Sequence, residues 1–403
     1  MTGLQRAKST FEFCGAIPAS KSILNRLLIL KSYSRGLVIV GDSGADDVLK
    51  MRGAIAALEN GRPADCGAAG TTFRFLALRA SRLPGRHLLL GSPRLLARPQ
   101  SELLELLAQL GCRAELRRDG LSIESSGWIL KDRTLKIDRS VSSQFASAVL
   151  LNAWGLPEPL EIVFAGDAVS EGYLQMTVAL VRRAGLDVAE TKAGFTISAG
   201  GAITVAKLEA EADLSSAFAV AALAIASGGS CQIENWPEKS LQPDALFVDI
   251  VNRMGVMTTL KNSRLGLAHD GRGLAGIDAK LDSAPDLFPV LAVLCAMASG
   301  RSKLHGAPHL AHKESDRIAK TAELLELLGV RTQKMPDGMV IEGAGSLSGK
   351  RASQPFDPAD DHRLAMAAAV ARAGGAELQL LRPETVNKSF PEFWPIFYGS
   401  GKP

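Results

Sequence analysis

Residues 215–235 read SSAFAVAALAIASGGSCQIEN, the clearest case of a pattern that recurs along the chain. Hydroxyl residues open the stretch, an apolar Ala/Leu-rich run of helical length follows, and glycines separate that run from a short final segment. Glycine is common where a helix ends, and short segments of this kind form strands. The stretch therefore predicts a helix followed by a strand.

Five other stretches share this pattern, and the six starts lie 50, 71, 73, 71 and 75 residues apart. A second helix and a strand pair follow most of them, as in SELLELLAQLGC and RAELRRDGLSIES. The repeat predicts a helix–strand–helix–strand–strand unit present six times. A single solenoid of stacked units is the alternative architecture. The five further starts are Lys21, Thr71, Ser142, Asp286 and Asp361.

Two irregularities at the ends of the chain indicate how the units are grouped. The sixth unit stops after its second helix, and residues 10–17 form a strand with no helix before it. If that strand completes the C-terminal half, the chain forms two similar α/β (α+β) domains of three units each. We expect one domain at 1–18 plus 244–403 and the other at 19–243, with crossings near Pro18–Ser20 and Gln242–Asp244.

Composition excludes several classes of protein. The 403 residues carry a net charge of +4, which is too small to favour nucleic acid or an anionic membrane as the main partner. A hydrophobic content of 46% rules out general disorder. Five scattered cysteines and the lack of an H-E-x-x-H sequence argue against disulfides and zinc. The start MTGLQRAKSTFEF lacks the apolar segment of a secretory signal, so we expect a cytoplasmic protein without a metal.

The first helix of each unit starts with a hydroxyl, a lysine or an acid. Taken one at a time, most of these residues are typical helix caps. If equivalent helix starts face one cleft, their N–H groups and partial positive charges form an anion site. Basic residues at the same connections favour a substrate with several phosphate or carboxylate groups. These basic residues are Lys21, Arg26, Arg74, Arg98, Lys313, Arg317, Arg363 and Lys388.

Two carboxylates lie in the same connections. Asp286 follows Pro285 at a helix start, and Glu314 lies within HKESDR. Both are suited to capping or to pairing with Lys313. A carboxylate among several cations also stays ionised and can accept a proton from a hydroxyl.

Nine segments of the chain form an ordered set of motifs. Residues 17–26 read IPASKSILNR, and the other segments are GAAGTTFRFL, SPRLLARP, SVSSQF, SLQPD, PDLF, HKESDRI, DDHRLAMA and NKSFPEFW. In this order, over residues 18–394, they resemble the EPSP synthase (3-phosphoshikimate 1-carboxyvinyltransferase) family. Residues 18–26, PASKSILNR, resemble its signature P-G-S-K-S-x-S-N-R.

The resemblance implies a two-domain inside-out α/β barrel of six βαβαββ repeats, three per domain, with the active site in the interdomain cleft. It implies transfer of the enolpyruvyl group of phosphoenolpyruvate to the 5-hydroxyl of shikimate 3-phosphate, in the pathway to chorismate and the aromatic amino acids. No metal or organic cofactor is implied, and we expect a monomer.

The resemblance also assigns roles residue by residue. Shikimate 3-phosphate would contact Lys21, Ser22, Arg26, Ser142, Ser143, Ser170, Asp286, His309 and Lys313. Phosphoenolpyruvate would contact Lys21, Gly70, Arg98, Gln144, Arg317, Arg363 and Lys388. Asp286 would be the base, and Glu314 and Lys21 are the candidates for the other proton transfers.

This sequence departs from the family pattern at Ala19, Ala68, His309 and Asp360. None of the four changes removes a charged catalytic group, so they bear on affinity and on sensitivity to the inhibitor glyphosate. The hairpin expected after Gly61 is also nearly absent.

Two alternatives remain. The related UDP-N-acetylglucosamine enolpyruvyl transferases carry Lys-Asn where this chain has Lys21-Ser22, and a cysteine in the loop that reads GSPRLLARP here. A non-catalytic scaffold of the same fold would not need Lys21, Asp286, Glu314, Arg317 and Arg363 together.

Overall fold

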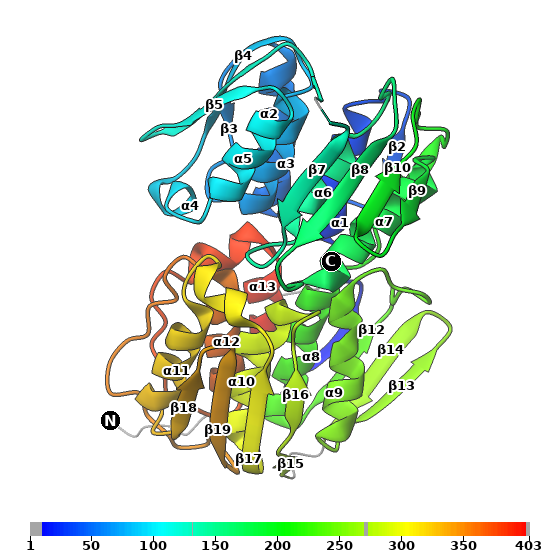
Figure 1. Ribbon diagram of the computed structural model, residues 1–403. Coiled ribbons are helices and arrows are strands. Elements are labelled where there is room, and N and C mark those ends of the chain that lie inside the picture. The colour runs from blue at the N-terminus through cyan, green and yellow to red at the C-terminus, as the bar shows by residue number, and fades with distance from the viewer. Residues whose placement is uncertain (1–9, 131, 270–272, 400–403) are drawn as a thin grey trace. The chain divides into compact units, whose positions relative to one another are not determined.

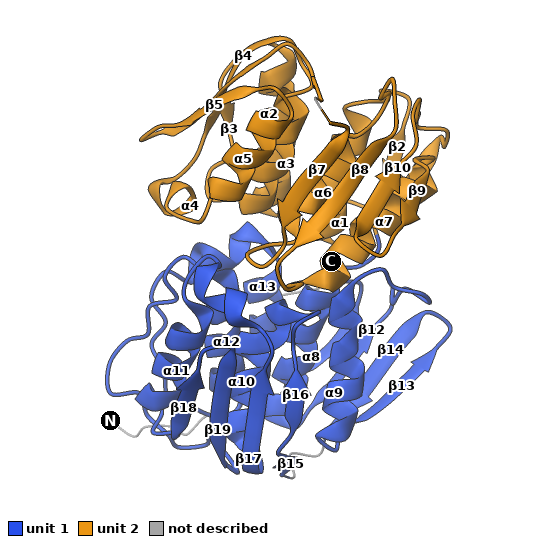
Figure 2. Ribbon diagram, viewed as in Figure 1, with its two compact units in different colours: residues 1–18, 211–403 blue, residues 19–210 orange. Residues whose placement is uncertain are grey.

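The computed structural model of the chain describes residues 10–130, 132–269 and 273–399 (Figure 1). Residues 1–9, which include most of the segment used to exclude a secretory signal, lie outside these ranges. Contacts divide the chain into two compact mixed α/β units and not into one continuous stack. Unit 1 comprises residues 1–18 and 211–403, and unit 2 comprises residues 19–210 (Figure 2).

Unit 1 takes its first strand from the N-terminus and the remaining elements from the C-terminal half. The first group is β1 (Glu12–Gly15), α8 (Leu214–Ser227), β12 (Ser230–Ile233), η1 (Pro243–Leu246), α9 (Phe247–Arg253), β13 (Met257–Lys261) and β14 (Arg264–Ala268). The second is β15 (Leu274–Ala275), β16 (Asp278–Lys280), η2 (Pro285–Leu287), α10 (Phe288–Met297), β17 (Ala298–His305), η3 (Pro308–His312), α11 (Arg317–Leu327), β18 (Thr332–Met335) and β19 (Gly338–Ala344). The last is α12 (His362–Ala373), η4 (Pro383–Lys388) and α13 (Phe393–Tyr398).

Unit 2 contains the elements between residues 19 and 210. They begin with α1 (Lys21–Lys31), β2 (Val38–Val40), α2 (Asp46–Glu59), β3 (Ala64–Asp65), α3 (Gly70–Ala80), β4 (Gly85–Leu90), α4 (Pro93–Leu96), α5 (Ser101–Gln109), β5 (Arg113–Leu116) and β6 (Gly120–Ser125). They continue with β7 (Thr134–Asp138), α6 (Gln144–Asn152), β8 (Leu160–Ala165), α7 (Glu171–Ala184), β9 (Val188–Glu190), β10 (Gly194–Ile197) and β11 (Lys207–Glu209).

The sheets repeat one strand order. Unit 1 contains β1-β12-β14-β13 and β15-β17-β19-β18, and unit 2 contains β3-β4-β6-β5 and β7-β8-β10-β9. In each sheet the first pair is parallel and the hairpin strands are antiparallel. This is the outcome that connection length dictates, because parallel neighbours need a helical crossover and antiparallel neighbours need only a turn.

The chain passes between the units at two equivalent strand–helix links. β1 pairs in parallel with β12, and β11 pairs in parallel with β2. The links that follow these strands are residues 16–20 and 210–213, and Asp213 N donates to Pro18 O at 2.9 Å. The second boundary therefore falls at residue 210, before α8, and not near Gln242–Asp244 as expected. The predicted boundary lies beyond α8 and β12, but both of these elements pack within unit 1.

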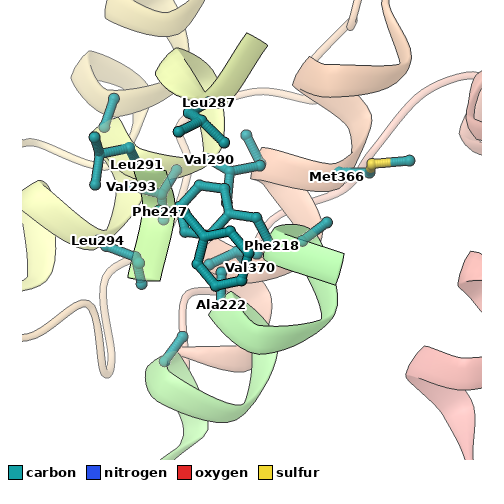
Figure 3. Close-up of a cluster of buried hydrophobic side chains, with 14 of the residues drawn as sticks. Phe218, Ala222, Phe247, Leu287, Val290, Leu291, Val293, Leu294, Met366 and Val370 are labelled. Atoms are coloured by element: carbon teal, nitrogen blue, oxygen red, sulfur yellow. The ribbon is translucent and has the colours of Figure 1, made fainter. Parts of the chain in front are cut away.

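Three buried helices occupy the centre of each unit. In unit 1, α8, α10 and α12 contact one another, and α1, α3 and α6 do so in unit 2. Their apolar residues lie all around the helix, which requires burial on every side. In Figure 3, Phe218 and Phe247 lie among the side chains of α10 and α12. Their rings stack with the ring centres 5.1 Å apart. Aromatic residues make up only 5% of the chain, which is consistent with cores built mainly from aliphatic residues.

Two regions lack the hairpin that the repeat predicts. Between α2 and β3 the chain has only residues 60–63, so β2 and β11 form a two-stranded sheet. This confirms the shortening expected after Gly61. Around α12, only isolated bridges join Arg351 to Glu377 and Phe356 to Leu380. In the described part of the chain, no helix combines the length and the apolar character needed to cross a membrane.

Candidate active site

Arg317 is the centre of a buried charge network in unit 1. Its Nε donates to Asp361 Oδ2 at 2.8 Å, and its Nη2 donates to Asp361 Oδ1 at 3.2 Å and to Glu314 Oε2 at 3.0 Å. Its Nη1 donates to Asp286 Oδ1 at 2.8 Å. The Arg317 and Asp361 side chains are 1% and 0% exposed, whereas those of Asp286 and Glu314 are 20% and 17% exposed. The network thus joins the starts of α10, α11 and α12 around a buried ion pair, and its two outer carboxylates reach solvent.

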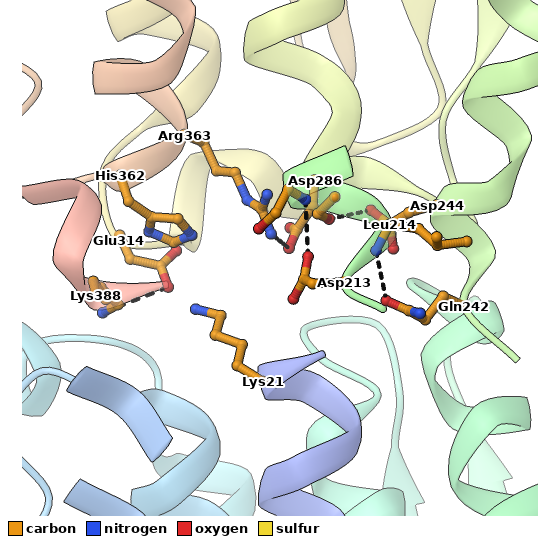
Figure 4. Close-up of polar contacts among 12 residues, drawn as sticks. Lys21, Asp213, Leu214, Gln242, Asp244, Asp286, Glu314, His362, Arg363 and Lys388 are labelled. Atoms are coloured by element: carbon orange, nitrogen blue, oxygen red, sulfur yellow. Dashed lines mark hydrogen bonds and ion pairs between the residues drawn. The ribbon is translucent and has the colours of Figure 1, made fainter. Parts of the chain in front are cut away.

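Asp286 lies between two guanidinium groups. Arg363 Nη2 approaches its Oδ2 at 3.4 Å (Figure 4). Arg317 contacts the other carboxylate oxygen, Oδ1. Burial alone would raise the pKa of Asp286, but the charges of Arg317, Arg363 and Lys313 hold it well below its usual value. Asp286 is therefore an ionised carboxylate that can accept a proton.

Glu314 and His309 complete this cluster. Glu314 Oε1 lies 3.8 Å from Lys388 Nζ, while its other oxygen accepts from Arg317 (Figure 4). His309 is 3% exposed. Burial, reinforced by the positive charge of Lys313, lowers the pKa of His309 to about 3. The imidazole is thus neutral near pH 7, and it can serve as a hydrogen-bond partner but not as a cation.

In unit 2, Lys21 forms an ion pair with Asp47. Lys21 Nζ lies 2.8 Å from Asp47 Oδ2, and the two side chains are 12% and 10% exposed. Thr72 Oγ1 donates to the Asp47 carbonyl at 3.4 Å. These contacts bring the starts of α1, α2 and α3 together. Asp47 is a partner that the sequence analysis missed, although its place in the first turn of α2 could have indicated a charged helix start.

Arg74 connects α3 to the start of α6. Its Nη1 donates to Gln144 Oε1 at 2.9 Å and to Ser142 Oγ at 3.4 Å, and its Nη2 donates to the Pro99 carbonyl at 2.9 Å. Gln144 Nε2 donates to Thr71 Oγ1 at 3.3 Å. Arg74 thus holds in place two segments with predicted substrate contacts, the one around Pro99 and the start of α6. Its position three residues after Thr71 in the sequence did not by itself indicate this role.

Gly70 and Arg98 lie directly against each other. A Cβ atom added to Gly70 would come within 2.7 Å of Arg98 Nη1 and 3.2 Å of its Cζ. Gly70 therefore leaves the space in which the guanidinium lies. The sequence placed both residues in one predicted subsite, and the structure brings them together.

Arg26 extends in the direction of α7. Its Nε donates to Thr177 Oγ1 at 2.7 Å, its Nη2 to the Tyr173 carbonyl at 3.1 Å and its Nη1 to the Ser22 carbonyl at 2.7 Å. Burial lowers the pKa of Arg26 to about 9. Ser170 precedes α7 in a left-handed conformation with φ of 54°, a geometry that is uncommon for a residue other than glycine.

The three central helices of unit 2 lack side-chain caps, whereas two of the three central helices of unit 1 have one. The N-cap residues of α1, α3 and α6 are Ser20, Ala69 and Ser143, and none of them makes a side-chain cap. In unit 1, Asp213 caps α8 and Asp361 caps α12. Asp361 therefore acts as the cap that its position predicts, whereas Ser143 at the start of α6 does not, and Asp286 in η2 makes no side-chain cap. Among the described residues, no group of three or more His, Cys, Asp or Glu is arranged to hold a metal ion.

Solved structures of known proteins share the fold of this chain. EPSP synthase from Acinetobacter baumannii superposes with a TM-score of 0.75 at 22% identity, over 98% of this chain and 97% of that chain. The enolpyruvyl transferase NikO from Streptomyces tendae superposes with a TM-score of 0.69 at 15% identity, over 98% of this chain and 95% of that one. The chain therefore has the enolpyruvyl transferase fold.

Sequence similarity defines the family within that class. A sequence model of the EPSP synthase (3-phosphoshikimate 1-carboxyvinyltransferase) family matches residues 18–397. A 3-phosphoshikimate 1-carboxyvinyltransferase from Syntrophobacter fumaroxidans is 33% identical over 95% of each chain. The chain belongs to the EPSP synthase family.

Proposed function

We propose that the protein transfers the enolpyruvyl group of phosphoenolpyruvate to the 5-hydroxyl of shikimate 3-phosphate, with release of phosphate. The observation that carries this proposal is the family match over residues 18–397, which spans every residue given a role above. The reaction serves the pathway to chorismate and the aromatic amino acids. We expect a cytoplasmic monomer in which each unit is an inside-out barrel of three repeats.

The base in this reaction is Asp286. Its carboxylate stays ionised between Arg317 and Arg363, so it can accept the proton of the 5-hydroxyl as the oxygen attacks C2 of phosphoenolpyruvate. The methylene carbon must gain a proton in the same addition, and Glu314 and Lys21 are the candidate donors. The resulting tetrahedral intermediate loses phosphate through C–O cleavage, and a methyl proton departs to restore the double bond.

The two anionic substrates require cations and hydrogen-bond donors. Shikimate 3-phosphate is assigned to Lys21, Ser22, Arg26, Ser142, Ser143, Ser170, His309 and Lys313, together with Asp286 on its hydroxyls. Phosphoenolpyruvate is assigned to Lys21, Gly70, Arg98, Gln144, Arg317, Arg363 and Lys388. Placing two reactants in fixed geometry can contribute about 7–11 kcal/mol to the barrier reduction. The uncapped starts of α1, α3 and α6 support anion binding in unit 2.

Arg317 contributes mainly by positioning. Its contacts to Asp361, Glu314 and Asp286 use four of the five guanidinium N–H groups. One N–H on Nη1 is therefore left for a substrate oxygen. The same contacts fix the Asp286 and Glu314 carboxylates, on which the proposed proton transfers depend.

A phosphate-release assay with two acceptors tests the proposal. Phosphate should be released from phosphoenolpyruvate when shikimate 3-phosphate is added, and not with phosphoenolpyruvate alone. Release with UDP-N-acetylglucosamine instead would assign the protein to the related transferase activity. Release with neither acceptor, from protein shown to be folded by circular dichroism, would contradict the enzymatic proposal.

A further inference from the structure

Unit 2 contains a cavity of about 230 Å³ that no proposed substrate residue lines. Its walls include Arg82, Trp128, Arg133, Leu156, Pro157 and Pro159. Sites for drug-sized ligands usually measure roughly 300–1,000 Å³, so this cavity suits a smaller molecule. Glu158 also lines the cavity, so its walls combine apolar side chains with two arginines and one carboxylate.

The cavity lies at the opposite helix ends from the proposed substrate residues. α3 starts at Gly70, beside Arg98, and ends at Ala80, two residues before Arg82. α6 likewise starts at Gln144 and ends at Asn152, shortly before Leu156. A helix rises about 1.5 Å per residue, so the 11 residues of α3 separate the two ends by about 16 Å. A molecule in the cavity would therefore not occupy the substrate positions.

Arg82 is a half-buried cation without a carboxylate partner among the described residues. Its guanidinium carbon lies 4.9 Å from the centre of the Trp128 ring, and its Nη2 donates to the Trp154 carbonyl at 2.6 Å. Burial lowers the pKa of Arg82, and the nearby charge of Arg79 adds to that effect. A desolvated guanidinium gains strongly from a bound anion, because the pair interacts across low-dielectric surroundings.

Arg133 supplies the second cation from a strained backbone. Its φ is 54°, in the left-handed region that non-glycine residues occupy at a cost. Its guanidinium forms an ion pair with Glu158, which lies between Pro157 and Pro159. Glu158 therefore compensates the charge of Arg133, whereas Arg82 has no carboxylate partner among the described residues.

We propose that this cavity binds a small organic carboxylate with an apolar or aromatic body. The carboxylate would pair with Arg82, since a guanidinium presents N–H groups in a fork that matches two carboxylate oxygens. The apolar body would lie against Trp128, Leu156 and the two prolines. A phosphate ion could use the arginines but would leave the apolar walls unused.

A purely structural role for Arg82 is the competing explanation. Arg82 lies just beyond the end of α3 and donates to a carbonyl beyond the end of α6, where a cation is favoured by the helix dipoles. That contact accounts for one N–H of the guanidinium. A structural role does not explain why Arg82 faces a cavity or why a second arginine, Arg133, lines the same cavity.

Benzoate and its neutral counterpart benzamide test the proposal on the full chain. The protein has four tryptophans, whose indole N–H signals are observable by ¹⁵N–¹H NMR, and Trp128→Phe assigns the relevant signal. Benzoate should shift the Trp128 signal saturably at millimolar concentration and leave those of Trp236 and Trp394 unchanged. Benzamide should bind at least about 10-fold more weakly, because it lacks the charge.

Two variants and a matched control locate the charge that is recognised. Arg82→Gln should weaken benzoate binding at least about 10-fold, and Arg133→Gln should weaken it by a smaller factor. Arg86→Gln, at a side chain that is 83% exposed, should bind benzoate as the unmodified protein does. No benzoate shift, equal binding of benzamide, or unchanged affinity in both Arg82→Gln and Arg133→Gln would each overturn the proposal. Because Arg133 is largely exposed, its variant stays informative if Arg82→Gln fails to fold.

Discussion

Asp361 and Arg317, 44 residues apart in the chain, form a two-point ion pair inside unit 1. Nε to Oδ2 measures 2.8 Å and Nη2 to Oδ1 measures 3.2 Å. Asp361 also accepts from Ser315 Oγ and from the backbone N of Arg363. One carboxylate therefore caps α12, anchors the start of α11 and orients the arginine that holds Asp286.

Replacing that carboxylate should destabilise the protein strongly. Asp361→Asn leaves Arg317 buried with one fewer counter-charge, and breaking a buried pair typically costs about 3–5 kcal/mol. We expect a loss near the lower end, about 3 kcal/mol, because Asp286 and Glu314 remain. Urea unfolding measures the change in the free energy of unfolding. Glu377→Gln is the control, because Glu377 pairs with Arg351 and the side chains of Arg351 and Glu377 are 82% and 65% exposed. We expect this control to lose at most about 1 kcal/mol. Equal effects of the two substitutions would contradict the anchoring role.

Removing the charge of Asp286 should stop proton transfer while the fold persists. Asp286→Asn retains the shape of the side chain but cannot accept the hydroxyl proton, so kcat should fall at least about 100-fold. Steady-state phosphate release measures the change, and circular dichroism checks the fold. Asp282→Asn, at a carboxylate paired with Lys280 on the surface, is the matched control and should keep normal turnover. A loss below tenfold in Asp286→Asn would remove Asp286 from the role of base.

The depressed pKa of His309 should make stability depend on pH. In the unfolded chain the imidazole takes up a proton below about pH 6.5, whereas in the folded protein its pKa is about 3. The unfolded state therefore binds more protons between these values, and the His309 contribution is lost as pH falls from 6.5 toward 3. His309→Gln should flatten the decline in the free energy of unfolding over this window. Parallel curves for the two proteins, from urea unfolding at several pH values, would show that His309 titrates normally.

A methyl group on Gly70 should displace Arg98. In Gly70→Ala the new Cβ would lie 2.7 Å from Arg98 Nη1, so the flexible guanidinium must move. If Arg98 binds phosphoenolpyruvate, the KM for that substrate should rise about 10- to 100-fold, the typical value of a hydrogen bond to a charged group. Gly53→Ala, where a Cβ has nothing within 4 Å, should leave this KM unchanged. An unaltered KM in Gly70→Ala would argue that Arg98 does not contact phosphoenolpyruvate.

Much of the local structure follows from the sequence. The apolar runs at 215–226 and 288–297 became central helices, because helices without a polar face must be buried. Gly185 ends α7 with φ of 113°, a conformation that glycine reaches without strain and that makes glycine common after helices. The positions of the helix starts and of the basic residues beside them could also be predicted, since each repeat carries similar residue types at the same place.

The pairing of distant segments was decided only by the tertiary structure. β11 is three residues, KLE, which is too short to show a period, so nothing in the sequence indicated that it pairs with β2 and ends unit 2 at residue 210. The partners Asp47 of Lys21 and Asp361 of Arg317 were equally hidden. Local propensity and periodicity act over a few neighbouring residues, whereas strand edges and buried charges take whichever partner the folded chain brings close.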